Sequence, residues 1–175
     1  ATLDSEGEVG QSTSIAIGTD GLAIISYLDV TNGDLKVAHC SDVDCSSAMI
    51  ATIDSEGKVG LNTSIAIGQD GRALISYWDI ENRDLKVAHC SDVQCSSANT
   101  ATLDSEGDVG RFTSITIGSD GLGIVGYFDF TNGDLKVAHC SDVQCTSATT
   151  TTLDSSDSVG RYNSIPTGDD GMALV

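Results

Sequence analysis

A 50-residue period restricts this chain more than any other feature of its sequence. The run Thr13–Asp54 recurs as Thr63–Asp104 and as Thr113–Asp154, and it begins a fourth time at Asn163. Self-similarity at a period of this size is typical of solenoids, propellers and other repeat arrays. Each copy is therefore interpreted as one structural unit, and equivalent residues differ in number by 50.

Four short apolar runs, separated by turn residues, fill each copy. The first turn contains Asp20 and Gly21, and the second contains Asn32 and Gly33, a dipeptide that strongly favours a β-hairpin. The runs are rich in β-branched and aromatic residues, as strands are. They predict an antiparallel meander with strands at Ser14–Gly18, Leu22–Val30, Leu35–Cys40 and Met49–Ile53.

The second run decides between architectures because it is apolar at nearly every position from Leu22 to Val30. A strand with one solvent-exposed face would alternate apolar and polar residues. Because this run does not alternate, both faces of the sheet are expected to be covered. The blades of a β-propeller meet this condition. A solenoid usually has shorter coils, and a β-trefoil has no place for a fourth, partial repeat. We therefore predict an all-β fold of β-propeller blades, about three and a half per chain.

This interpretation divides the chain as one repeat domain over residues 1–175. It comprises a lone fourth strand at 1–5, blades at about 13–54, 63–104 and 113–154, and a partial blade at 163–175. Pro166 replaces Ala16 of the first copy, and proline is tolerated on an edge strand such as the inner strand of a blade. Propellers typically have four to eight blades, so three and a half cannot close a ring. Either further blades follow, or copies associate through their open ends.

The net charge of −18 opposes binding to nucleic acid and to anionic lipid. The sequence has no run of 18 apolar residues, so membrane insertion is not expected. An acidic surface suits divalent cations or plain solubility.

The cysteines recur as one pair in each copy, with four residues between the partners. The predicted disulfides are Cys40–Cys45, Cys90–Cys95 and Cys140–Cys145. They indicate an oxidising location, either secreted or at the cell surface. Zinc is the alternative, because a histidine precedes the first cysteine of each pair, at His39, His89 and His139. Adjacent strand residues point to opposite faces, which disfavours a shared metal and favours structural histidines.

Oxygen-bearing side chains cluster around the second turn. A calcium loop uses such carboxylate and amide oxygens, but Asp and Asn also bond their own backbone in turns. The middle copy carries Arg83 where Gly33 stands, and the full calcium-binding spacing is missing, so turn chemistry is favoured. No cofactor is expected; calcium is the alternative at Asp29, Asn32, Asp34, Asp129, Asn132 and Asp134.

Aromatic residues gather late in the chain, at positions that vary between copies. They suit either packing between blades or a patch that stacks on sugars or on a partner. These residues are Trp78, Phe112, Phe128, Phe130 and Tyr162. Asn62 begins the only Asn-x-Ser/Thr sequence, so it is the expected glycosylation site, in a loop.

Two motifs recur along the chain. The first is ISYLD at Ile25–Asp29, ISYWD at Ile75–Asp79 and VGYFD at Val125–Asp129. The second is TNGDLKVA, at Thr31–Ala38 and Thr131–Ala138, with ENRDLKVA in the middle copy. Together they resemble a repeat of secreted bacterial and archaeal proteins built on the pattern ISYYD…TNGDLKYA. The resemblance covers the whole chain and implies propeller blades and an extracellular setting, with no activity assigned.

Catalytic motifs are missing from the repeats. The Asp-box of sialidases is absent, and each carboxylate pair that a glycosidase could use occurs in near-identical copies, whereas an active site usually breaks such symmetry. We therefore expect a secreted, non-enzymatic structural or adhesive protein whose partners are copies of itself, joined through incomplete terminal blades into a ring or filament. A glycan-binding propeller is the alternative, and a glycoside hydrolase is less favoured.

Overall fold

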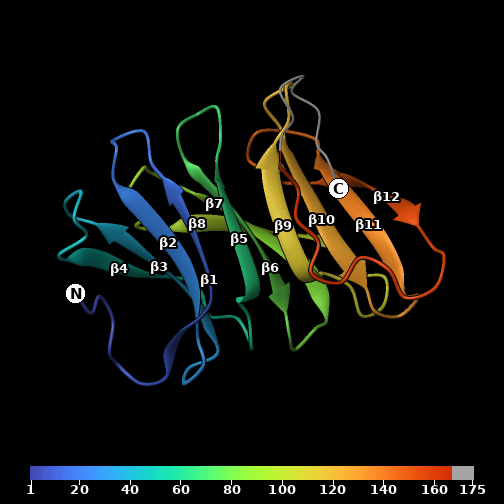
Figure 1. The fold of residues 1–175 in the computed structure, drawn as a ribbon, viewed down its shortest axis with the longest axis horizontal. Helices are drawn as coiled ribbons and strands as arrows, with labels where there is room; N and C mark the ends of the chain where they lie inside the picture. Colours follow the sequence, from blue (N-terminus) through green and yellow to red (C-terminus); the bar gives the residue numbers. More distant parts are fainter. Residues whose placement is uncertain (167–175) are drawn as a thin grey trace.

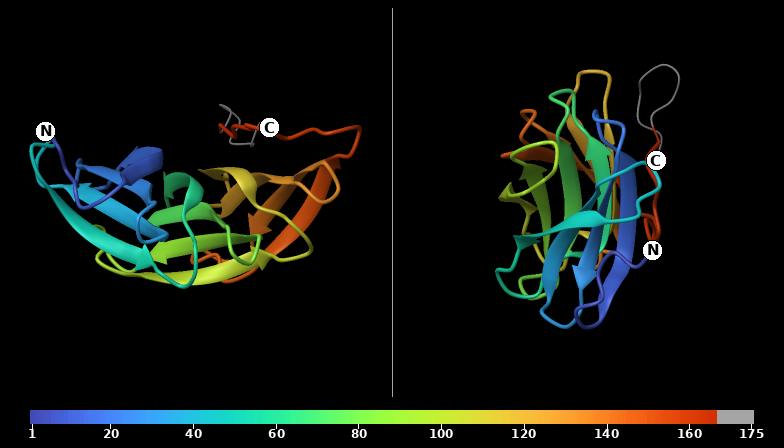
Figure 2. Two further views of the ribbon diagram at one scale, coloured as in Figure 1. Left: turned by 90° about the horizontal axis from the view of Figure 1, so that it is seen from below. Right: turned by 90° about the vertical axis from the view of Figure 1, so that its left-hand side faces the viewer.

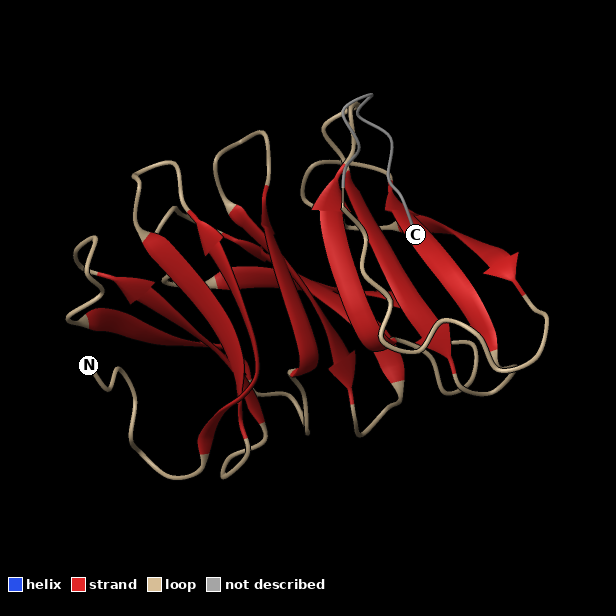
Figure 3. Cartoon of the chain, in the orientation of Figure 1, coloured by secondary structure: helices blue, strands red, loops and turns tan. Residues whose placement is uncertain are grey.

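The structure is a computed structural model in which residues 1–166 are described. That part of the chain contains twelve strands and no helix (Figures 1 and 3), and hence no helix that could cross a membrane. The strands form three four-stranded antiparallel sheets, each a simple meander. Blade 1 contains β1 (Val9–Ile17), β2 (Ala23–Asp29), β3 (Asp34–Cys40) and β4 (Ala48–Asp54); blade 2 contains β5 (Leu61–Ile67), β6 (Ala73–Asp79), β7 (Asp84–Cys90) and β8 (Ala98–Asp104); blade 3 contains β9 (Arg111–Ile117), β10 (Gly123–Asp129), β11 (Asp134–Cys140) and β12 (Ala148–Asp154).

The three blades lie side by side along an arc, with the first strand of each blade next to the first strand of its neighbour (Figure 2). Side chains tie these inner strands together, since Ser14 Oγ accepts the N–H of Ile65 at 3.2 Å and Ser64 Oγ accepts that of Ile115 at 3.1 Å. The fourth strands lie at the outer edge. This radial arrangement is that of propeller blades.

Apolar side chains fill the two spaces between adjacent blades. All seven residues of β6 are buried, which confirms that both faces of a second strand are covered. The cluster between blades 1 and 2 includes Ile24, Leu35, Val37, Ile65, Ile75 and Tyr77. The cluster between blades 2 and 3 includes Leu74, Leu85, Val87, Ile115, Val125 and Tyr127.

Three of the sequence-based boundaries are wrong. In blade 1 the inner strand begins at Val9, several residues before Ser14. Its pairing with β2 shifts register around Ser12, which has a left-handed conformation (φ 53°), and pairing is found on both sides of that residue. Residues 1–5, predicted as a lone fourth strand, form no strand. Residues 163–166 of the expected partial blade likewise form no strand, and residues 167–175 lie outside the described part.

Glycine is required where the linker after each blade passes the third strand of that blade. A Cβ on Gly60 would lie 2.9 Å from Leu35 Cα, and a Cβ on Gly110 would lie 2.6 Å from Leu85 Cα. Both are closer than real contacts of this kind, so no side chain fits there. The equivalent Gly10 has nothing within 4 Å of that position, because no blade of the described chain precedes it.

Candidate functional site: the junctions between blades

A buried carboxylate joins each blade to the next. Asp54, at the end of β4, accepts hydrogen bonds at Oδ2 from Tyr77 Oη and Lys86 Nζ of blade 2, both at 2.6 Å. Asp104 accepts the same pair of bonds from Tyr127 and Lys136, also at 2.6 Å. Every polar atom of this contact therefore has a charged or hydrogen-bonded partner, as burial requires.

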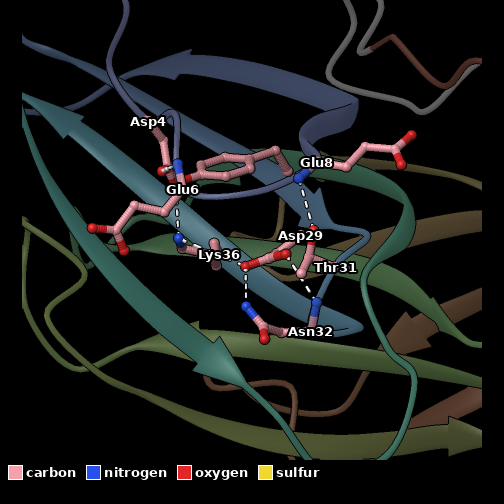
Figure 4. Close-up of polar contacts among 8 residues, drawn as sticks. Asp4, Glu6, Glu8, Asp29, Thr31, Asn32 and Lys36 are labelled. Carbon is pink, nitrogen blue, oxygen red and sulfur yellow. Dashed lines mark hydrogen bonds and ion pairs between the residues drawn. The ribbon is translucent and has the colours of Figure 1, made fainter.

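Asp4 makes the same contact at the start of the chain (Figure 4). Its Oδ2 accepts from Tyr27 Oη at 2.7 Å and from Lys36 Nζ at 2.6 Å. Residues 1–5 thus take the place that the end of a preceding blade would take, although they form no strand. Asp154, the last of the four equivalents, is exposed and accepts hydrogen bonds from the backbone N–H and the hydroxyl of its near neighbour Ser156.

These contacts shift the pKa values of the groups involved. The hydrogen bond from Lys36 is the main cause that lowers the pKa of Asp4, from 3.8 to about 2. Burial alone would raise the pKa of Asp54, but the hydrogen bonds from Lys86 and Tyr77 outweigh it and lower the pKa. Burial, followed by the charge of Asp54, raises the pKa of Tyr77. Each site thus keeps an ionised Asp and a neutral Tyr at neutral pH.

The linker between blades adds backbone contacts on both sides. The Val59 N–H donates to the Gly33 carbonyl of blade 1 at 2.8 Å, and the Lys58 carbonyl accepts from the Ile80 N–H of blade 2 at 2.8 Å. In blade 1, the Glu8 N–H donates to Thr31 Oγ1 at 2.7 Å (Figure 4). The turns between second and third strands are therefore linked from blade to blade.

The calcium candidates are engaged in turn contacts. The buried Asp29 carboxylate accepts from the Asn32 backbone N–H at 3.1 Å and from Asn32 Nδ2 at 2.8 Å (Figure 4). Asp129 and Asn132 repeat these bonds at 3.0 and 2.9 Å. The remaining candidates are Asp34, whose pKa is raised by burial, and Asp134. Among residues 1–166, no three His, Cys, Asp or Glu side chains are grouped to hold a metal.

All three predicted cysteine pairs are disulfides: Cys40–Cys45, Cys90–Cys95 and Cys140–Cys145. The zinc alternative is therefore wrong, since no free thiol occurs among the described residues. Each histidine instead points to the Asp of the first turn in its own blade, and these pairs, all at 2.9 Å, are His39–Asp20, His89–Asp70 and His139–Asp120. The histidines thus connect the third strand to the first turn.

Arginine side chains lie over three of the candidate aromatic rings, Trp78, Phe128 and Phe130. The Arg111 guanidinium lies 4.4 Å from the ring centre of Trp78 and 4.1 Å from that of Phe130, and Asp108 holds it by two hydrogen bonds of 2.9 and 2.6 Å. Arg161 lies 5.2 Å from the ring centre of Phe128. Trp78 and Phe128 are buried, whereas Phe130 is 48% exposed.

Phe112 and Tyr162 form a second aromatic contact, with ring centres 4.4 Å apart. Tyr162 is 81% exposed. The two rings border a pocket of about 310 Å³ at the start of the inner strands, lined by Ser12, Thr13, Asn62, Thr63, Phe112, Thr113, Tyr162 and Asn163. Asn62 lies in β5 and not in a loop as expected, and its Oδ1 accepts the Phe112 N–H at 3.1 Å.

The two ends of the stack expose apolar side chains that are covered inside it. Ile15 and Ile17 of β1 are each 62% exposed, whereas Ile65 and Ile115, the equivalents of Ile15, are 7% and 6% exposed. At the other end Leu153 is 50% exposed, and its equivalent Ile53 is 8% exposed. The β1 end therefore presents one half of the junction that the chain forms twice internally, and the blade 3 end leaves Leu153 of its outer strand uncovered.

No family model matches this chain, and no curated protein matches it significantly. Solved structures with a similar fold include a GH43 β-1,3-galactosidase (TM-score 0.64, 10% identity, 95% of this chain and 41% of that one). The Dos1 propeller has a TM-score of 0.55 and 11% identity over 93% of this chain and 40% of that one. An α-L-arabinofuranosidase from Lactobacillus brevis has a TM-score of 0.53 and 10% identity over 81% and 52%.

These likenesses concern the fold. Three meanders joined through their inner strands, together with these neighbours, define the chain as a set of β-propeller blades. The chain spans about half the length of the neighbours or less.

Proposed function

We propose that this is a secreted, non-enzymatic structural or adhesive repeat protein whose copies associate end to end. The observation that carries the proposal is the exposure of Ile15 and Ile17, at 62% each, at positions that other blades cover. In the internal junctions one face of a blade packs on the opposite face of its neighbour, so a contact of the same kind between copies joins two different faces. The contact is therefore heterologous, and it leads to a ring or an open filament.

The internal junctions indicate what such a contact contributes. Burying an isoleucine side chain stabilises by about 1.5–3 kcal/mol, and two isoleucines are available on β1. Association costs translational and rotational freedom, so two side chains alone leave a weak interaction. Linked copies with many such contacts gain from multivalency.

Secretion is supported by the three disulfides, because such bonds persist in oxidising compartments. The resemblance of the ISYLD and TNGDLKVA motifs to secreted propeller repeats points the same way.

The test is the oligomeric state of an end-face variant. Ile15→Asp places a charge on the uncovered face and should abolish concentration-dependent growth in light scattering. Met49→Asp is the matched control, since Met49 is exposed on the outer strand β4 where other blades carry the exposed Asn99 and Thr149. Association that survives Ile15→Asp unchanged, or a wild-type chain that stays monomeric at millimolar concentration, would contradict the proposal.

Glycan binding is the second candidate, and the Phe112–Tyr162 pocket favours it. An exposed ring beside polar side chains is suited to stacking on a sugar. The residues lining this pocket include no carboxylate, whereas glycoside hydrolysis generally uses a pair of them, which supports binding over hydrolysis. On a glycan array, Tyr162→Ala should remove any signal that the wild-type chain gives; a signal that persists would place the site elsewhere.

A further inference from the structure

Residues 161–166 pass over blade 3 (Figure 1), and their hydrogen bonds match those of the first strand of a following blade. The Ile165 N–H donates to Ser114 Oγ at 3.0 Å, and the equivalent bonds in the internal junctions measure 3.2 and 3.1 Å. Asn163 Nδ2 donates to the Phe112 carbonyl at 2.8 Å, where a threonine hydroxyl donates at 3.0 and 2.7 Å in the internal junctions. Ile165 is buried, as Ile65 and Ile115 of the internal junctions are.

One residue pair distinguishes this contact from the internal junctions. A serine of one blade and a threonine of the next share a buried hydroxyl bond in each internal junction, at Ser26–Thr63 (2.7 Å) and Ser76–Thr113 (2.9 Å). At blade 3 the pair is Gly126 and Asn163. A Cβ on Gly126 would overlap Ile165 Cδ1 and lie 2.9 Å from Asn163 Oδ1. The larger asparagine therefore fits only because the opposing residue has no side chain.

The strand β1 carries the other half of such a junction. Its exposed residues Thr13, Ile15 and Ile17 are the equivalents of residues that are covered in β5 and β9. A second copy docked in the register of the internal junctions would lay β1 over Ser114 and Gly126. Its residues 4–10 would then take the place of residues 154–160 of the first copy. The two segments occupy the same space, so only one can be present.

We propose that the face of blade 3 around Ser114 and Gly126 binds β1 of a second copy, in competition with the chain's own residues 154–166. This inference rests on the proposed self-association and adds its register and its competitor. Gly126 leaves the space that the Asn163 side chain fills, so the face of blade 3 binds the chain's own segment in preference to β1 of another copy, which carries Thr13 at this position. The wild-type chain is therefore expected to associate weakly, and loss of the segment strengthens the contact.

Two variants remove the competitor in different ways. A chain ending at Leu153 lacks it entirely. Gly126→Ser adds a side chain that crowds Asn163 and Ile165, and it restores the hydroxyl partner for Thr13 of a second copy. Both should lower the dissociation constant of self-association, measured by sedimentation velocity; the added hydroxyl bond corresponds to about tenfold. Ser164→Ala, a change at an exposed residue of the same segment, is the control and should leave the constant unchanged.

A second readout follows the segment itself. At a dilution where every variant is monomeric, Gly126→Ser should speed hydrogen exchange at the Ile165 amide, which is bonded to Ser114 in the wild-type chain. Adding Thr13→Val to Gly126→Ser should remove the gain in association and leave the fast exchange in place, because only the contact between copies uses Thr13.

The outcomes separate this inference from the function on which it rests. Stronger association of both variants, reversed by Thr13→Val, supports it. If the wild-type chain associates and the truncated chain associates equally or less, the competition is wrong while self-association stands. If no variant associates at any concentration, both proposals fail.

Discussion

Single buried carboxylates link one blade to the next. Asp54 belongs to blade 1, while its two donors, Tyr77 and Lys86, belong to blade 2. The Lys86 side chain is mostly buried, so an ammonium group left there without this partner would be costly. These residues therefore hold neighbouring sheets together by charge as well as by apolar contact.

Asp54→Asn should destabilise the chain by about 3 kcal/mol, because it leaves the buried Lys86 without a counter-charge. Asp154→Asn is the matched control: the same residue type at the equivalent, exposed position should give no measurable change. Urea unfolding followed by circular dichroism measures both. Equal effects of the two substitutions would show that the contact between blades contributes little.

The lowered pKa of these carboxylates predicts acid sensitivity. A group with a depressed pKa in the folded state contributes stability that is present above its unfolded pKa and is lost as pH falls through the folded value. For Asp4 this window runs from about pH 4 to about pH 2, and Asp54 and Asp104 shift in the same direction. The urea midpoint should fall steeply across this window in the wild-type chain and less steeply in Asp54→Asn.

The tyrosines of the same contacts predict alkaline sensitivity. Burial and the adjacent carboxylates raise the pKa values of Tyr77 and Tyr127, so the folded state keeps both hydroxyls neutral. The unfolded chain ionises them above about pH 10, and stability is lost as pH rises beyond that value. Absorbance at 295 nm should show these tyrosines ionising together with unfolding; independent ionisation in the folded protein would contradict the burial.

Arg83 occupies a position that suits glycine. Its φ is 67°, while Gly33 and Gly133 adopt 81° and 80° at the same turn position. A left-handed conformation costs a residue with a Cβ about 1–2 kcal/mol, and glycine avoids this cost. Part of the advantage is offset, because the greater freedom of glycine in the unfolded chain costs about 0.5–1 kcal/mol on folding. Arg83→Gly should therefore stabilise by about 0.5 kcal/mol in urea unfolding, and the reciprocal Gly33→Arg should destabilise. A loss of stability in Arg83→Gly would mean that the arginine side chain makes a favourable contact.

At the scale of the element, each blade depends on a short closed loop between its third and fourth strands. The disulfide closes this loop, and the backbone around it bonds to itself, as in the Ser91 N–H to Ser97 carbonyl contact at 2.8 Å. Both cysteines of blade 2 are fully buried. The loop thus fixes the outer strand to the blade.

Removing the Cys90–Cys95 disulfide by Cys→Ala at both positions should cost about 2 kcal/mol, the loop-closure value for a ring of this size. Thermal unfolding measures the loss. In blade 1, Cys45 is only partly buried, so limited reduction followed by thiol alkylation should label blade 1 before blade 2. Simultaneous labelling would indicate that reduction requires unfolding of the whole stack.

At the scale of the whole molecule, charge opposes the association that apolar faces favour. Copies that each carry a net charge of −18 repel one another. Added salt screens this repulsion, so self-association should strengthen between about 0.01 M and about 0.5 M ionic strength. Light scattering across a salt series gives the measurement, with Ile15→Asp as the variant that should not respond. Association that weakens with salt would indicate ion pairs between copies in place of apolar contact.

Local sequence signals were enough to predict the blades. The period, the Asn-Gly turns and the apolar second strand act within a few residues, and a strand covered on both faces leaves few architectures. The cysteine pairs were predictable for the same reason, since their partners lie in one loop. The predicted strand boundaries were wrong where the backbone departs from regular pairing, as at Ser12 and Asn62. Side-chain type does not reveal a left-handed residue inside a strand.

The contacts between blades depended on the tertiary structure. Asp54, Tyr77 and Lys86 recur at constant spacing in every copy, which is a signal visible in the sequence, but the spacing does not show that the three meet. They come from two sheets, and only the packing of one blade on the next brings their side chains within 2.6 Å. The same packing places Arg111 between Trp78 and Phe130 and leaves Ile15 uncovered, because burial is a property of neighbouring sheets and not of the residue alone.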